Sequence, residues 1–402
     1  MKVTPEDVGL SGARLVKIDL LTQKYIEEGK LPGTLTLVAR KGRIAHLETQ
    51  GQSDLENSTP VKRDTLFRIY SMSKPITSVA LMMLYEDGHF LLDDPVSRFI
   101  PAFRNLKVHH IDEKGHAALQ DTQREMTIKD LLTHTSGLTY GFMNATPVDA
   151  MYREQAVEES GNLDEMIRKL CDLPLLFSPG SQWSYSVATD VCGYLVQKIS
   201  DTSFDEFLQE QIFDPLEMED TGFYVPESKA HRLAANYERT RDNGLRLIDA
   251  PEKSRYLKPP GLHSGGGGLV STADDYLKFA QMLLNRGEYN GNRLLGRKTV
   301  ELMTMNHLPD NGDLTSMGQA VFSETPYDGI GFGLGFSVML DPAKASILGS
   351  KGEYAWGGAA STYFFVDPAE ELIVILLTQL MPSSSYPIRR ELRVTAYQSI
   401  ID

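Results

Sequence analysis

The spacing of apolar residues changes along the chain and divides it into three stretches. In the first, residues 11–29 repeat apolar positions with a helical period, and Gly29 ends this predicted helix. Residues 35–39 and 44–48 read as short strands on either side of Lys41-Gly42, which predicts a β-hairpin. Residues 65–70 form a third extended segment. The first stretch therefore predicts one helix and three strands.

After residue 70 the pattern becomes mainly helical and stays so to about residue 260. Residues 79–84 are apolar at every position, which is typical of a helix buried on all sides, and Gly88 is its expected end. Further helices are predicted over 127–134, 162–173, 186–199 and 204–213. Small hairpins are predicted from 106–110 with 117–119, and from 234–238 with 246–249.

The last stretch returns to strands. A helix over 274–285 precedes predicted strands over 336–340, 362–366 and 372–377, and a helix over 388–400 closes the chain. Because residues 372–377 are all apolar, we expect a central strand covered on both faces. The loop Asp367-Pro368-Ala369-Glu370 predicts a hairpin between the last two strands.

This order of elements predicts an α+β fold. Strands lie at both ends of the chain with helices between them, so both ends contribute to one antiparallel sheet flanked by the terminal helices. The predicted domains are a sheet domain of residues 1–70 and 265–402 and an inserted, mainly helical domain of residues 71–264. A ligand site is expected in the cleft between the two domains.

Composition and charge narrow the possible partners. The 402 residues carry a formal net charge of −14 and contain no long basic run, which argues against nucleic acid and anionic membranes as partners. No stretch reaches the length of a membrane span, and residues 1–8 lack the apolar core of a secretion signal. We therefore expect a cytoplasmic protein with a small-molecule substrate, its oligomeric state left open. Cys171 and Cys192 are expected as reduced, buried thiols, with one disulfide as the alternative.

The most informative motif is Ser71-Met72-Ser73-Lys74, directly before the apolar helix. Positions three apart share a helix face, so Lys74 can hold the Ser71 hydroxyl and take its proton. The N-terminal end of a helix also offers unpaired N–H groups and a partial positive charge to a developing oxyanion. The alternative interpretation of this common spacing is a capped helix start with a solvated lysine.

Two later segments can complete such a site. Tyr185 follows a turn at Ser178-Pro179-Gly180 and precedes a predicted helix, so its hydroxyl can approach Lys74; a packing tyrosine is the alternative. Trp356-Gly357-Gly358-Ala359 stands before the strand over 362–366, and its glycines allow a substrate to lie against the backbone. The N–H groups of Ala359 and Ser71 can then form an oxyanion hole. The alternative for this segment is a bulge or close strand crossing.

Together, Ser71-x-x-Lys74, Tyr185 and the glycine-rich strand motif resemble the class C β-lactamase-like serine hydrolases. That superfamily includes D-alanyl-D-alanine carboxypeptidases, family VIII carboxylesterases and fungal statin side-chain acyltransferases. Three further segments resemble the family: residues 131–138 (LLTHTSGL), residues 177–180 (FSPG) and residues 266–269 (GGGL) before the helix start at 271–273. The resemblance runs from about residue 10 to the end. It implies a β-lactamase/penicillin-binding-protein-like fold, Ser71 as the acylated nucleophile, shared base and acid roles for Lys74 and Tyr185, and no cofactor.

Two departures from the family pattern point to the substrate. β-Lactamases and peptidases of this superfamily usually have Tyr-x-Asn, but here Val187 replaces the asparagine. They usually have Lys-Thr-Gly or His-x-Gly, but here the residues are Trp356-Gly357-Gly358. A lost lysine–carboxylate hydrogen bond is worth about 1.5–3 kcal/mol, and an indole cannot replace it. Tyr-Ser-Val and Trp-Gly-Gly resemble the family VIII carboxylesterases, so the expected substrates are short-chain neutral esters, with weak β-lactam hydrolysis as a side activity.

Several rival functions remain open at this stage. Within the family they are a β-lactamase, a D-alanyl carboxypeptidase and an acyltransferase, and the missing export signal argues against the first two. Outside enzymology, the rival is a binding or sensor protein without turnover. A histidine-based triad with His134 or His263 lacks the Gly-x-Ser-x-Gly elbow. The acidic and histidine residues over 109–116 fit no standard metal-ligand spacing, so we expect no metal.

Overall fold

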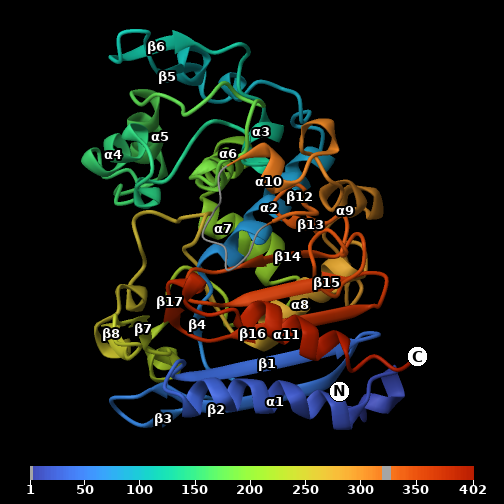
Figure 1. Cartoon of the computed structure of the whole chain (residues 1–402). Helices are drawn as coiled ribbons and strands as arrows, with labels where there is room; N and C mark the ends of the chain where they lie inside the picture. The colour runs from blue at the N-terminus through green and yellow to red at the C-terminus, as the bar shows by residue number, and fades with distance from the viewer. Residues whose placement is uncertain (1–2, 319–326) are drawn as a thin grey trace.

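The computed structural model describes residues 3–318 and 327–402, and its centre is one antiparallel sheet built from both ends of the chain (Figure 1). The strand order is β12 (Ile330–Phe332), β13 (Ser337–Met339), β14 (Tyr354–Gly357), β15 (Tyr363–Asp367), β16 (Leu372–Leu377), β1 (Gly33–Arg40), β2 (Arg43–Asp54) and β3 (Thr59–Pro60). The first and last stretches of the chain meet where β1 pairs with β16, with Leu37 opposite Ile375. This arrangement confirms the predicted fold class.

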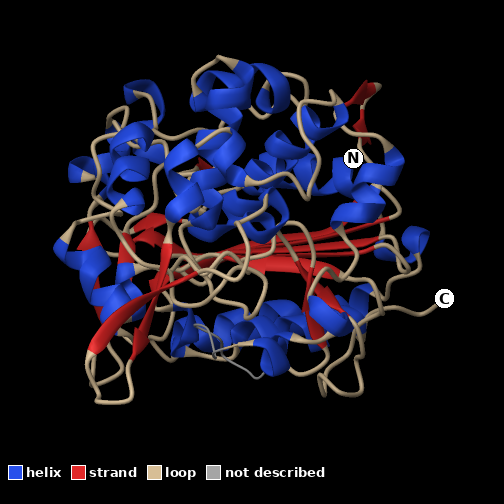
Figure 2. Cartoon of the chain, turned by 90° about the horizontal axis from the view of Figure 1, so that it is seen from above, coloured by secondary structure: helices blue, strands red, loops and turns tan. Residues whose placement is uncertain are grey.

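Strand β16 is fully buried, as its uniformly apolar sequence predicted. Successive side chains of a strand point to opposite faces of a sheet. Ile373, Ile375 and Leu377 accordingly join the hydrophobic cluster on one face, and the alternating residues Leu372, Val374 and Leu376 join the cluster on the other. The sheet therefore separates two cores. Figure 2 shows its strands edge-on, between two layers of helices.

The two terminal helices form the thinner layer. Helix α1 (Gly12–Glu27) and helix α11 (Ile388–Tyr397) contact each other, and their apolar sides share one cluster with Val38 and Phe365 of the sheet. The hairpin turn between β1 and β2 falls at Lys41-Gly42, where both residues have positive φ angles of 51° and 72°. A two-residue turn of this kind matches the twist of the flanking strands, so this prediction is also confirmed.

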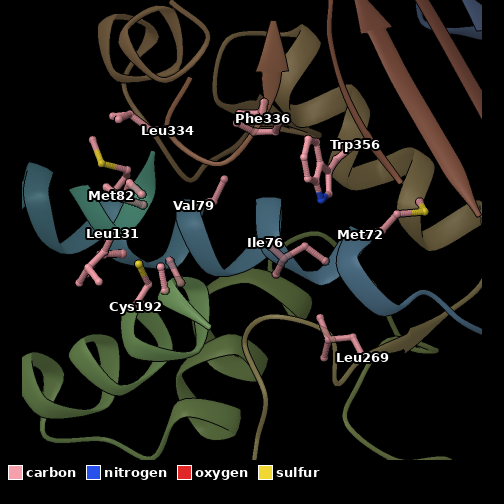
Figure 3. Packing of buried hydrophobic residues seen from close by; sticks show 14 of the residues in the cluster. Met72, Ile76, Val79, Met82, Leu131, Cys192, Leu269, Leu334, Phe336 and Trp356 are labelled. Atoms are coloured by element: carbon pink, nitrogen blue, oxygen red, sulfur yellow. The ribbon is translucent and has the colours of Figure 1, made fainter. Parts of the chain in front are cut away.

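Helix α2 (Ser73–Glu86) is the centre of the thicker layer and is enclosed on nearly every side. It packs against α6 (Ala188–Ser200), and Figure 3 shows Val79 and Ile76 of α2 between Cys192 of α6 and Phe336 on the sheet side. One continuous hydrophobic cluster joins these helices to the sheet. The domain boundaries at residues 70 and 265 stay predictions.

The remaining elements surround these layers. The helices are α3 (Ile128–Leu132), α4 (Pro147–Glu154), α5 (Leu163–Cys171), α7 (Phe204–Leu208), α8 (Ala273–Leu284), α9 (Arg297–Met303) and α10 (Leu314–Met317). The short strands are β4 (Phe67–Arg68), β5 (Lys107–Ile111), β6 (Ala117–Asp121), β7 (Asn236–Arg239), β8 (Leu245–Asp249), β9 (Val270–Ser271), β10 (Glu288–Tyr289), β11 (Asn292–Arg293) and β17 (Leu380–Met381). The predicted helices and hairpins are present, whereas α4, α9, β12 and β14 were not predicted.

Three smaller expectations can be compared with the structure. Only Phe67–Arg68 of the predicted segment 65–70 is a strand, because the backbone turns at Tyr70. Cys171 and Cys192 are both free thiols; Cys192 is buried and Cys171 is partly exposed. Among the described residues, no helix combines the length and the apolar character that crossing a bilayer requires.

Candidate active site

Ser71 lies in a single 3₁₀ turn (Tyr70–Met72) that runs directly into α2. Tyr70, the residue before it, has a φ of 44°, a left-handed conformation that few non-glycine residues adopt. Neighbouring groups hold this turn: Ser73 Oγ donates to the Tyr70 carbonyl at 2.6 Å, and Tyr276 donates to the Met72 carbonyl at 2.9 Å. The turn places Ser71 on the wall of the pocket described below.

Lys74 is in the first turn of α2 and is only 1% exposed. Its Nζ donates to the Tyr140 hydroxyl at 2.9 Å, to the Gly266 carbonyl at 2.6 Å and to Ser71 Oγ at 3.4 Å. An ammonium group has three protons, so each of them has a recorded acceptor. Of these three hydrogen-bond acceptors, Ser71 is the one that lines the pocket.

Tyr185 is the second group beside the nucleophile. Its hydroxyl lies 2.6 Å from Ser71 Oγ, closer than Lys74 does. The Tyr185 ring lies 4.4 Å from Lys74 Nζ, within the range of a cation–π contact, and 5.6 Å from the ring of Trp356. The structure therefore brings together the three residues predicted for the chemistry, although Tyr185 is 114 positions from Ser71 in the chain. Their catalytic roles stay predictions.

The histidines considered for a triad do not replace this arrangement. His134 packs its ring 5.1 Å from that of Tyr185, and its Nδ1 is 3.1 Å from Ser186 Oγ. Burial, assisted by the charge of Lys74, holds the pKa of His134 well below its ordinary value, so the ring is a neutral packing group. His263 pairs with Asp205 at 3.1 Å beside a different cavity. Within the described ranges, no group of three or more candidate side chains is placed to hold a metal ion.

The glycine-rich segment ends β14, which contacts the Ser71 turn, and it forms part of the pocket wall. Trp356, Gly357, Gly358 and Ala359 all line it together with Ser71. Among the described residues, neither the Ser71 N–H nor the Ala359 N–H donates to another backbone group. Both N–H groups are therefore available to an oxyanion, as the predicted oxyanion hole requires.

The two glycines are explained by neighbouring protein groups. A Cβ atom on Gly357 would lie 2.7 Å from Cζ of Arg389, and one on Gly358 would lie 2.4 Å from the Ile69 carbonyl oxygen. The space that the missing side chains leave is thus taken by Arg389 and Ile69. Substrate binding by these glycines stays a prediction, and it would have to use their pocket-facing atoms.

Two residues that support Lys74 were not predicted in this role. Asp190 on α6 is buried, and its Oδ1 accepts from Ser264 Oγ at 2.5 Å and from the Gly266 N–H at 3.0 Å. It thereby orients the residue whose carbonyl holds Lys74. Burial raises the pKa of Asp190 and the charge of Lys74 opposes that shift, whereas burial holds the pKa of Tyr140 well above its ordinary value. The sequence feature that could have indicated this role of Asp190 is an aspartate in an otherwise apolar part of α6.

The pocket has a volume of about 650 Å³, which is within the range of sites for drug-sized ligands. Besides the glycine-rich segment, it is lined by apolar and aromatic side chains, including Phe142, Ile330, Met339, Ile347 and Tyr363. Its charged lining residues are Arg255, Glu353, Arg389, Arg390 and Arg393. Val187, which replaces the asparagine of the family pattern, is fully buried outside the pocket lining. Tyr140 is a buried residue that contacts Lys74, and Trp183 and Tyr354 are core residues.

A second buried ionic network lies at the other end of β14. Arg393 of α11 pairs with Glu353 at 2.5 Å and donates to the Tyr363 hydroxyl at 3.1 Å. The single hydroxyl of Tyr397 lies 2.6 Å from Glu353 Oε2 and also 2.6 Å from Asp367 Oδ2. Because this hydroxyl has one proton, the second contact needs a proton on a carboxyl group. Burial raises the pKa of Glu353 to about 7 although Arg393 acts in the opposite direction.

Comparison with known proteins agrees with this geometry. Esterase EstB of Burkholderia gladioli is 32% identical over 397 residues, covering 93% of this chain and 93% of that protein. The structure of EstCE1, described as a hydrolase with promiscuous acyltransferase activity, has a TM-score of 0.80 and 28% identity and covers 96% of this chain and 99% of its own. Simvastatin synthase from Aspergillus terreus, as the LovD6 mutant, has a TM-score of 0.81 and 26% identity, with coverage of 96% and 95%.

A family model described as Beta-lactamase matches residues 18–398, which is nearly the whole chain. The esterase relative resembles this chain along almost its full length, as the resemblance to family VIII carboxylesterases predicted. The chain belongs to the Beta-lactamase family, and within it is a serine hydrolase with esterase and acyltransferase relatives.

Proposed function

We propose that this protein is a carboxylesterase that hydrolyses short-chain esters through an acyl-enzyme on Ser71. The observation that carries the proposal is the contact of the Ser71 hydroxyl, on the pocket wall, with Tyr185 at 2.6 Å and Lys74 at 3.4 Å. A hydroxyl is a weak nucleophile until a neighbouring group takes its proton. These two residues are the proton-accepting groups within reach of Ser71.

The proposed reaction has two steps. Ser71 Oγ bonds to the ester carbonyl carbon while its proton passes to the Tyr185–Lys74 pair, which must start one proton short, as a Tyr185 phenolate beside the Lys74 ammonium. The N–H groups of Ser71 and Ala359 stabilise the oxyanion. The pair then returns that proton to the alcohol oxygen as the carbon–oxygen bond of the ester breaks. In the second step water attacks the acyl carbon, the pair accepts a proton from the water, and Ser71 regains its hydroxyl as the free acid leaves.

The residue at position 356 supports neutral esters as the substrate class. Trp356 stands where relatives with β-lactam or peptide substrates usually have Lys-Thr-Gly or His-x-Gly, and it contributes an apolar surface to the wall beside Ser71. β-Lactam hydrolysis is then a slow side activity.

Acyl transfer is a second candidate. A pocket of about 650 Å³ is larger than a short acyl group needs, which leaves room for an acceptor alcohol in place of water. Relatives with acyltransferase activity in their descriptions support this candidate. A rising yield of transferred ester when a small alcohol is added would distinguish transfer from hydrolysis.

The test compares nitrophenyl acetate and nitrophenyl butyrate with nitrocefin, using wild type and Ser71→Ala. We expect ester turnover well above nitrocefin turnover, and loss of turnover together with loss of fluorophosphonate labelling in Ser71→Ala. Ester turnover that survives in Ser71→Ala would remove Ser71 as nucleophile. Nitrocefin turnover far above ester turnover would contradict the esterase assignment, and a folded protein without either activity would favour a binding protein.

A further inference from the structure

Arg389 of α11 lies against the glycine-rich segment and also lines the pocket. Its Nη2 donates to the Gly358 carbonyl at 2.6 Å and to the Thr362 carbonyl at 2.9 Å. The Gly358 N–H also donates to the Thr362 carbonyl at 2.9 Å, which closes the segment into a tight loop. Ala359 is inside this loop, so the arginine holds both ends of the segment that carries a proposed oxyanion donor.

The glycine at position 357 is what lets Arg389 come so close. A Cβ atom there would lie 2.7 Å from Cζ of Arg389 and 2.8 Å from Nη2. Real Cβ contacts are not that short, so a larger residue at this position would displace the guanidinium group. The sequence Gly357-Gly358 therefore fits the approach of an arginine from a helix more than thirty positions later in the chain.

The other side of the same loop rests on the strand that leads to the nucleophile. A Cβ atom on Gly358 would lie 2.4 Å from the Ile69 carbonyl oxygen, and Thr362 Oγ1 donates to that oxygen at 3.4 Å. Ile69 is two residues before Ser71. The loop is thus held between Arg389 and the backbone that carries Ser71.

The Gly358 carbonyl and the Ala359 N–H belong to the same peptide unit. That unit is planar and trans, so its C=O and N–H point in opposite directions. A group that fixes the Gly358 oxygen on one side therefore fixes the direction of the Ala359 N–H on the other. This matters because glycine leaves the preceding backbone torsions free, and a flipped peptide would turn the N–H away from the pocket. The Ser361 N–H also donates to this oxygen, at 3.2 Å.

We propose that Arg389 is a positioning residue that keeps the Ala359 N–H aimed at the oxyanion. This inference rests on the proposed function, because the oxyanion forms only if Ser71 attacks an ester carbonyl. Removal of one oxyanion-hole donor typically costs about 10²- to 10³-fold in kcat. In a variant without Arg389 the Ser361 N–H still holds the Gly358 oxygen. We therefore expect kcat to fall roughly ten- to hundredfold, as for a partly misplaced oxyanion-hole donor.

The experiment compares Arg389→Ala and Arg389→Lys with wild type, using a neutral nitrophenyl ester and an ester with an anionic acyl chain. Arg293→Ala is the matched control, because Arg293 also donates to two backbone carbonyls, those of Arg286 and Leu295, but lies on β11 outside the pocket lining. We expect Arg389→Ala to lose kcat/KM equally on both esters and to react more slowly with the fluorophosphonate. Millimolar guanidinium should restore part of the activity, and Arg293→Ala should match wild type.

Three results would overturn the proposal: wild-type kcat/KM in Arg389→Ala, a loss confined to the anionic ester, which would make Arg389 a substrate contact, or an equal loss in Arg293→Ala. If Arg389→Ala does not fold, Arg389→Lys decides by the same comparison, because lysine keeps the charge but cannot reach both carbonyls with one planar group. Failure of the proposed function is recognised separately, because wild type would then show neither ester turnover nor labelling of Ser71.

Discussion

Two buried ionic networks lie beside the pocket of this protein. They differ in whether one of their hydrogen bonds ends on the proposed nucleophile. On the helix side, Lys74 donates two short hydrogen bonds to Tyr140 and Gly266 and a longer one, 3.4 Å, to the Ser71 hydroxyl in the pocket wall. On the sheet side, Arg393 donates to Leu348, Tyr363 and Glu353. Tyr363 and Glu353 also line the pocket, but among the described residues none of the three hydrogen-bonds to Ser71.

The comparison shows that burial of charge does not identify a catalytic group by itself. Both networks are almost inaccessible to solvent, and the sheet-side network contains the carboxyl group with the pKa raised to about 7. Structural ion pairs also perturb pKa values. What distinguishes the helix side is a nucleophilic oxygen that faces the pocket, so substitutions there should change turnover and substitutions on the sheet side should change stability.

The largest expected effect is on turnover, in Tyr185→Phe. The substitution removes the hydroxyl 2.6 Å from Ser71 and keeps the ring in its aromatic surroundings. We expect kcat/KM for nitrophenyl acetate to fall roughly 10³- to 10⁴-fold, near the top of the range for proton-transfer groups. The urea midpoint should stay close to that of wild type. Near-normal turnover in a folded variant would place proton transfer elsewhere.

The matching change on the sheet side is Arg393→Met. It leaves Glu353 and Asp367 buried without their cation, so we expect a loss of about 3–5 kcal/mol in the free energy of unfolding. Turnover per folded molecule should change little by comparison. The double variant Arg393→Met with Glu353→Gln removes both charges and should recover part of the stability in urea denaturation. A stable single variant would contradict the account of this network.

Glu353→Gln tests the pH dependence of the sheet side. Between pH 4.5 and about 7 the folded protein keeps the Glu353 proton and the unfolded chain releases it. This group therefore stabilises the fold most below pH 4.5, and that contribution is lost as pH rises to about 7. We expect the difference between wild type and Glu353→Gln to change by on the order of 3 kcal/mol over this window. Parallel stability curves for the two proteins would exclude this titration.

The smallest expected effect is that of Asp190→Asn on the helix side. Asparagine keeps a side-chain oxygen that can accept from the Gly266 N–H, but it removes the carboxyl group that interacts with the charge of Lys74. We expect kcat/KM to fall about tenfold, at the low end of the range for groups that act on proton transfer, with little change in unfolding free energy. Ser264→Ala, which removes a hydrogen bond to the same carboxylate, is the control for a purely structural effect. Equal losses in both variants would contradict a specific role for the charge.

Local patterns predicted much of the fold and the core of the site. The structure confirms three predictions that needed only residues adjacent in the sequence. They are the buried helix over residues 79–84, the Lys41-Gly42 turn and the buried strand β16. Ser71 and Lys74 are three positions apart across the junction of the 3₁₀ turn and α2, so their contact could also be predicted. Tyr185 required the resemblance to a family, because its distance along the chain contains no geometric information.

The residues that support the site could not be predicted in the same way. Strand β14 has only four residues and runs into two glycines, so no strand period was visible. Asp190, Tyr140 and Arg389 act across separations set by tertiary packing. The segment 65–70 looked extended, but the left-handed residue at position 70 turns the chain toward the nucleophile. Such a conformation is held by surrounding contacts and leaves little trace in composition.

The pairing of β1 with β16 has a consequence for biosynthesis. More than three hundred residues separate the two strands, so at roughly 5–20 residues per second the ribosome needs on the order of half a minute to supply the partner of β1. During that interval one edge of an apolar strand has no neighbour in the nascent chain. A fragment that stops before residue 372 can carry the nucleophile helix but cannot complete the central pair, so full-length translation precedes a finished sheet.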